Sequence, residues 1–72
     1  MSKASVKAEI DRKKAYVATK REEVKLWRAR KAATKEKSYK SYCDGQIVVK
    51  QKDIASKMAE IARLRERLKY EK

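Results

Sequence analysis

Apolar residues recur at intervals of seven in the second half of the chain, and this spacing limits the possible folds more than any other feature. The series consists of Ile47, Ile54, Ile61 and Leu68, with Met58 and Leu64 beside it. Because an α-helix makes one turn in about 3.6 residues, residues seven apart stay on one side of it. The pattern predicts a long helix that packs against another helix as in a coiled coil.

A weaker stripe of the same kind runs along the first half. Its apolar members are Val6, Ile10, Val17, Val24 and Trp27. Most other residues there are Ala, Lys, Arg and Glu, which favour helix, and the chain contains no Pro. Lys13 and Lys20 occupy positions where a strong coiled coil would have Leu, so their stems must cover apolar surface while the ammonium groups reach water. We therefore predict a first helix over residues 3–43 with a modest interface.

The dipeptide Asp44-Gly45 is the one turn signal, and Gly45 is the single glycine. A left-handed glycine there would end a helix and reverse the chain. The expected fold is all-α: one domain over residues 1–72, an antiparallel coiled-coil-like hairpin whose second helix covers 46–71. An alternative stays open, because the aromatic and β-branched residues around this dipeptide also suit a short β-hairpin within 38–50.

A chain that reverses at Gly45 has poorly matched helices. Ile61 falls near Trp27, whereas Ile54 and Met58 face Lys35 and Lys31. Val6 and Ile10 then extend about 20 Å beyond the second helix. Unmatched apolar residues at both places predict a homodimer or a place in a larger assembly. The predicted interface residues are Val6, Ile10, Val17, Val24, Ile54, Met58, Ile61, Leu64 and Leu68.

The charge of the chain is strongly positive, with 22 Lys and Arg against 10 Asp and Glu, a net charge of +12. Such a charge attracts nucleic acid, ribonucleoprotein or an acidic protein. A membrane surface is a weaker candidate because the apolar faces are narrow. The lone Cys43 cannot form an intramolecular disulfide, and neither a membrane span nor a signal peptide is visible. We expect an intracellular protein, cytoplasmic or nucleoid-associated, that is not secreted.

Five basic residues share one heptad position in the first half. This basic row consists of Lys7, Lys14, Arg21, Arg28 and Lys35. On a continuous helix it would extend over about 42 Å, with neighbours about 10 Å apart. A structural flank usually mixes Glu with Lys, whereas every member here is positive. The row, together with Arg30 and Trp27, is therefore the predicted nucleic-acid-binding set, in which arginine can hold a phosphate through two parallel hydrogen bonds.

Trp27 has two interpretations. As the largest apolar residue it can belong to the core, opposite Ile61. Alternatively, an indole beside Arg28 and Arg30 can stack on an unpaired base. The core role is the more usual one for a residue of this type, and base stacking stays open as the alternative.

The residue types argue against catalysis. The chain has no His, one Cys and one Gly, so it lacks the parts of a catalytic triad, a zinc site or a glycine-rich phosphate loop. We expect no enzyme activity, no cofactor and no metal. The expected function is binding of RNA or DNA through phosphate contacts. The alternative is a small regulatory or structural protein, of the kind viruses and phages encode, that docks on an acidic protein or assembles as a coiled-coil oligomer.

Overall fold

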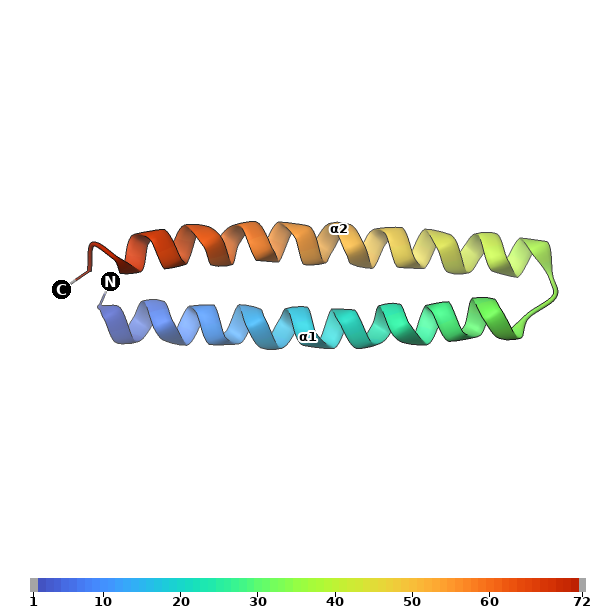
Figure 1. Cartoon of the computed structure of the whole chain (residues 1–72), viewed down its shortest axis with the longest axis horizontal. Helices are drawn as coiled ribbons and strands as arrows, with labels where there is room; N and C mark the ends of the chain where they lie inside the picture. The colour runs from blue at the N-terminus through green and yellow to red at the C-terminus, as the bar shows by residue number, and fades with distance from the viewer. Residues whose placement is uncertain (1, 72) are drawn as a thin grey trace.

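The structure, a computed structural model that describes residues 2–71, consists of two long helices. Helix α1 spans Lys3–Ala33 and helix α2 spans Lys37–Leu68. They run antiparallel and side by side, with both chain ends at one end of the molecule (Figure 1). This arrangement confirms the predicted all-α helical hairpin. The predicted domain also included Met1 and Lys72, which lie outside the described residues.

The chain reverses at Thr34–Glu36, so the predicted turn at Asp44-Gly45 is wrong. Thr34 and Glu36 have extended backbones, with ψ of 149° and 121°, and the Thr34 hydroxyl accepts a hydrogen bond of 3.2 Å from the Glu36 N–H. Gly45 lies inside α2 without a positive φ. The bounds 3–43 and 46–71 are therefore incorrect.

The alternative β-hairpin within residues 38–50 is also wrong. All of this segment is helical, and no strand occurs in residues 2–71. The β-branched residues in it have other roles, because Ile47 is buried against α1 whereas Val48 and Val49 are exposed on the outer surface of α2. Packing of the buried positions therefore outweighs the local preference of these residues for strand.

The two helices, of 31 and 32 residues, match along their whole length. The core cluster contains Val6, Ile10, Val17 and Ile61, with Ile54, Leu64 and Leu68 packed against it. The predicted overhang of Val6 and Ile10 is therefore wrong, since Val6 is 0% and Ile10 6% exposed. Ile54 meets this core rather than Lys35, and Met58 is 41% exposed. The mismatch that suggested a homodimer does not exist in the folded chain.

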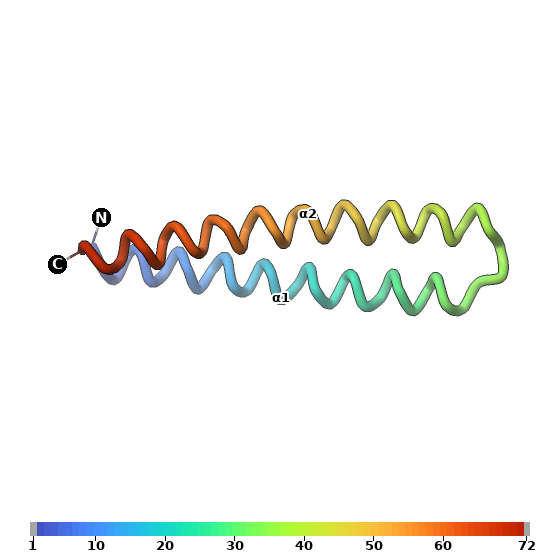
Figure 2. Tube along the Cα trace, turned by 45° about the horizontal axis from the view of Figure 1, so that its top comes forward, coloured from blue at the N-terminus to red at the C-terminus, as the bar shows by residue number. Residues whose placement is uncertain are grey.

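The molecule is a narrow rod, and its Cα trace measures 56 × 14 × 12 Å. In the rotated view of Figure 2, the two helices are separated near the turn, and one overlaps the other near the chain ends. Their axes therefore cross at a small angle. Buried side chains form one thin seam rather than a globular centre. They are Val6, Ile10, Val17, Val24, Cys43, Ile47 and Ile61. Lys13 and Lys20 extend along this seam as expected, with side chains only 20% and 22% exposed.

Candidate nucleic-acid interface

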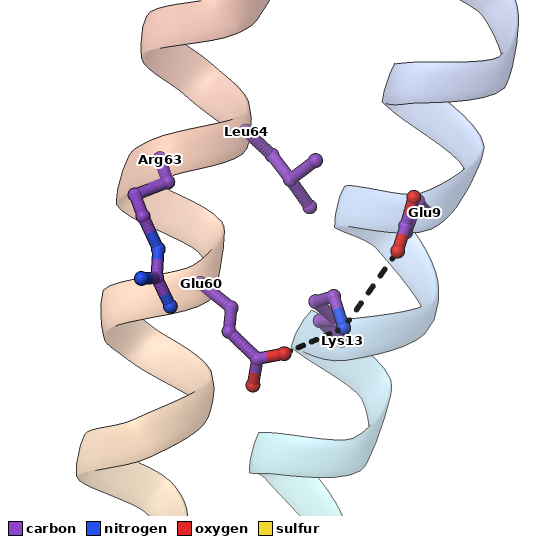
Figure 3. Close-up of a pocket in the computed structure, with 5 residues that line it drawn as sticks. All are labelled: Glu9, Lys13, Glu60, Arg63 and Leu64. Carbon is purple, nitrogen blue, oxygen red and sulfur yellow. Dashed lines mark hydrogen bonds and ion pairs between the residues drawn. The ribbon is translucent and has the colours of Figure 1, made fainter. Parts of the chain in front are cut away.

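Ion pairs and a hydrogen bond join α1 and α2 along one side of the rod. The Lys13 ammonium lies 3.2 Å from a Glu60 carboxylate oxygen and 3.8 Å from one of Glu9 (Figure 3). Farther along, the Tyr16 hydroxyl donates to Asp53. Lys50 on α2 pairs with Glu23 on α1 at 3.5 Å. Glu9, Tyr16 and Glu23 are spaced by sevens and therefore share one side of α1, which we call the paired edge.

Two pKa shifts reflect the contacts of the paired edge. The hydrogen bond that Tyr16 donates to Asp53 raises the pKa of the phenol above its ordinary value of 10.0. The hydrogen bond from Lys13 lowers the pKa of Glu60 below its ordinary value of 4.5. The charged form of Glu60 is thus favoured by folding, although its exposure to water keeps the energetic effect small.

The thermal midpoint of the protein should fall in acid partly because Glu60 becomes protonated. A carboxyl whose folded pKa is lowered stabilises the fold above its unfolded pKa, and this contribution is lost as the pH falls through the folded pKa. We expect a steady midpoint near neutrality and a decline that begins near pH 4.5. Thermal melts of Glu60→Gln should show a lower neutral midpoint and a shallower acid decline. An acid decline of Glu60→Gln as steep as that of the parent would contradict the prediction.

The basic row lies across the seam from the paired edge. Lys7, Lys14 and Arg21 each precede a paired-edge residue by two positions, which is about 200° around the helix. Arg28 continues the row, which extends about 32 Å along α1. Lys35 lies in the turn, so it is not part of the helical row and the expected 42 Å was too long. We call the side that bears Lys7, Lys14, Arg21 and Arg28 the basic edge.

Every member of the basic row is exposed, and none forms an ion pair with any residue of 2–71. The acidic residues are engaged elsewhere, and only Asp11 and Glu36 form no ion pair within the same range. Most of the negative charge therefore neutralises other cations. The positive charge of the basic edge remains available to a partner.

Helix α2 adds residues to the basic edge that the sequence did not identify. One hollow there is lined by Arg21, Val24, Lys25, Arg28, Gln51 and Ile54. A second, near the chain ends, is lined by Lys3, Lys7, Arg65, Leu68 and Lys69. From the sequence alone, the cations late in α2 need no function, because positive charge is favourable at the negative C-terminal end of a helix. Only the register between the two helices places Arg65 beside Lys7. Arg65 follows Met58, a predicted interface residue, by seven positions. This interval was the signal in the sequence that Arg65 lies on the side of the helix that faces α1.

Trp27 and Arg30 do not join the basic edge. The Trp27 ring meets Tyr42 of α2 edge-on, with centroids 5.6 Å apart, and the Arg30 guanidinium lies 4.7 Å from the Trp27 centroid. Arg30 is seven residues from Glu23, which places it on the paired edge. The predicted position of Trp27 opposite Ile61 is wrong, because Ile61 packs in the cluster with Val6.

The half-buried Trp27 instead belongs to an aromatic contact near the turn. Tyr39 stacks on Tyr42 with centroids 6.2 Å apart, and Tyr42 is 55% exposed. Because Arg30 covers one face of the indole, Tyr42 offers the more accessible ring for stacking on a base. The structure thus separates the predicted nucleic-acid-binding set into an open row and an aromatic cluster.

In the range 2–71, no group of three or more His, Cys, Asp or Glu side chains is placed to hold a metal ion, and Cys43 is buried. Neither α1 nor α2 is long and apolar enough to cross a membrane. A scan against protein-family models gave no match, and searches of curated proteins and solved structures gave none either.

Proposed function

We propose that this protein is a non-enzymatic binder of nucleic acid, or of a ribonucleoprotein, and that it contacts phosphates through the basic edge. One observation carries the proposal: an exposed row of cations forms no ion pair with residues 2–71, in a chain whose carboxylates are mostly paired. The row consists of Lys7, Lys14, Arg21 and Arg28. Such cations have no folding role that the contacts reveal. Their mutual repulsion opposes folding and is relieved by a polyanion.

The geometry of the row favours nucleic acid over an acidic protein surface. Its members recur about every 10 Å along a straight edge about 32 Å long. A nucleic-acid backbone offers negative charge at regular short intervals, so a linear row can engage several phosphates. Contacts of this kind bind with little preference for sequence, because phosphates are the same at every position. Binding is then driven by counterion release and weakens steeply with salt.

Docking on an acidic protein is the second candidate, and the outer surface of the hairpin supports it. Leu26 on α1 and Val48 and Val49 on α2 are exposed, Val49 by 61%. Apolar side chains of this kind can add contacts with a partner protein that phosphates cannot use. Oligomers of the hairpin belong to the same class of proposal, although the well-matched helices give them less support.

Changing Lys14, Arg21 and Arg28 together to Gln should weaken binding to duplex DNA and RNA. Glutamine preserves helix propensity, so the variant should stay folded. If all three residues meet phosphates, the slope of log affinity against log salt should decrease by about three units, similarly for different sequences. Fluorescence anisotropy with labelled duplexes over a range of salt concentrations measures this slope.

The control removes three cations of the same types from other surfaces. Arg12, Lys52 and Arg63 are exposed and form no ion pair with residues 2–71. Changing them together to Gln lowers the net charge equally and should have a clearly smaller effect. Equal losses of affinity in the two triple variants would mean that net charge alone is responsible. No loss in either variant would move the acidic-protein candidate to first place.

A further inference from the structure

The hollow near the chain ends is lined by four basic side chains, two from each half of the hairpin. Lys3 and Lys7 come from α1, Arg65 comes from α2, and Lys69 directly follows α2. Leu68 completes the lining, and no acidic residue belongs to it. Lys3, Lys7 and Arg65 form no ion pair with residues 2–71, whereas Lys69 pairs with Glu66 at 3.1 Å. Three of the four cations in the hollow therefore have no ion-pair partner among residues 2–71.

A second hollow at the same end of the rod is lined by acidic as well as basic residues. On the paired edge, Lys13 and Arg63 line a hollow together with Glu9 and Glu60, and Lys13 contacts both carboxylates (Figure 3). Arg63 thus shares its hollow with two carboxylates, whereas Arg65, two residues later, lines a hollow without acidic residues. The first turn of α1 also lacks an acidic residue to offset its positive end. The two edges differ in the charge they leave for a ligand.

We propose that the hollow formed by Lys3, Lys7, Arg65 and Lys69 is a phosphate-binding site that holds a backbone phosphate of nucleic acid. The inference rests on the proposed function and extends it. Arg65 can donate two parallel hydrogen bonds to one phosphate, and the three lysines add positive charge around it. With this site the basic edge extends from Arg28 to Lys3, about 38 Å along α1.

Placement of the site between the helices has a consequence for binding. Arg65 and Lys7 are far apart in the sequence and meet only when the hairpin closes. Each helix alone therefore holds half of the site. Nucleic acid that binds there selects the folded hairpin and raises its thermal midpoint, because a ligand that binds only the folded state stabilises it.

Comparison of Arg65→Gln with Arg63→Gln tests the site. Both arginines are exposed, lie on the same helix and form no ion pair with residues 2–71, so the two variants have equal net charge. With a labelled DNA duplex at fixed low salt, Arg65→Gln should lose about tenfold in affinity and about one unit of salt slope. Arg63→Gln should change affinity by less than about twofold. Circular dichroism verifies that both variants are folded.

Inorganic phosphate and lipid vesicles distinguish the sources of the phosphate. In nuclear magnetic resonance spectra, phosphate should shift the side-chain Nε–H signal of Arg65 and leave that of Arg63 in place; equal shifts at both would overturn the site. Binding of the parent to phosphatidylserine vesicles but not to the duplex would assign the hollow to a membrane headgroup and overturn the proposal.

The outcomes also separate this inference from the proposed function. A parent protein that binds no duplex contradicts the proposed function itself. A parent that binds, and whose binding is weakened by the triple change at Lys14, Arg21 and Arg28, retains the function. In that case, equal behaviour of Arg65→Gln and Arg63→Gln overturns the end site alone.

Discussion

Replacing Ile61 by Asp should unfold the hairpin at room temperature. Ile61 is 2% exposed and belongs to the cluster with Val6, Ile10 and Val17. An unpaired carboxylate in that position costs several kcal/mol, in addition to about 2 to 5 kcal/mol for the lost aliphatic packing. A thin core in a chain of 72 residues leaves little margin, since small domains are typically stable by only about 5 kcal/mol. Far-ultraviolet circular dichroism should show a large loss of helix.

The neighbouring residue provides the control. Ala62 is exposed on the same turn of α2, so Ala62→Asp introduces the same charge without burying it. Its cost should stay below about 1 kcal/mol, which reflects the lower helix propensity of Asp. Equal losses of helix in the two variants would contradict the observed seam. A folded Ile61→Asp protein would mean that residues 6–17 do not pack against this part of α2.

The fold class followed from the sequence because heptad spacing is a strong signal. Both apolar stripes repeat at or near intervals of seven, and such stripes must be buried against another helix. The position of Lys13 along the seam was also predictable, because its long stem can cover apolar surface while its ammonium group reaches the edge of the seam. These features depend on local periodicity alone.

The chain does not reverse at its one local turn signal, because pairing of the apolar stripes outweighs that signal. A helical glycine costs about 1 kcal/mol relative to alanine. Leaving Val6 and Ile10 unpaired in water would forgo about 1.5 to 3 kcal/mol for each side chain. The sum of the packing terms is larger, so the chain accepts Gly45 inside α2 and reverses elsewhere.

The apolar stripes of the sequence are compatible with the observed turn. The pairs Ile10 and Ile61, Val17 and Ile54, and Val24 and Ile47 are all centred between Lys35 and Glu36. This midpoint lies in the observed turn at Thr34–Glu36. The stripes alone do not fix the turn, because the pairs Ile10 and Leu68, Val17 and Ile61, and Val24 and Ile54 match as well and are centred on Tyr39.

The candidate site was predictable only in the part that belongs to one helix. The basic row of α1 follows from spacing, so Lys7, Lys14, Arg21 and Arg28 were identified correctly as neighbours on one face. The contribution of Arg65 and the separation of Arg30 from the row both depend on the register between helices. An error of about ten residues in the turn therefore concealed the cations that α2 adds.

Substitutions of Gly45 should affect stability in opposite directions, and together they test the position of the turn. A Cβ atom added at Gly45 would meet nothing within 4 Å, and the residue has helical backbone geometry. Gly45→Ala should therefore raise the free energy of unfolding by about 0.5 to 1 kcal/mol, through helix propensity and lower entropy of the unfolded chain.

Gly45→Pro should instead destabilise the protein by about 3 kcal/mol or more. Proline within a helix removes one backbone hydrogen bond and clashes with the preceding turn, and Gly45 lies between the buried residues Cys43 and Ile47. A kink there would pull both away from α1. Urea unfolding of the parent and both variants measures the differences. A destabilising Ala together with a tolerated Pro would place the reversal at Asp44-Gly45 after all, whereas the opposite signs confirm one continuous helix from Lys37 to Leu68.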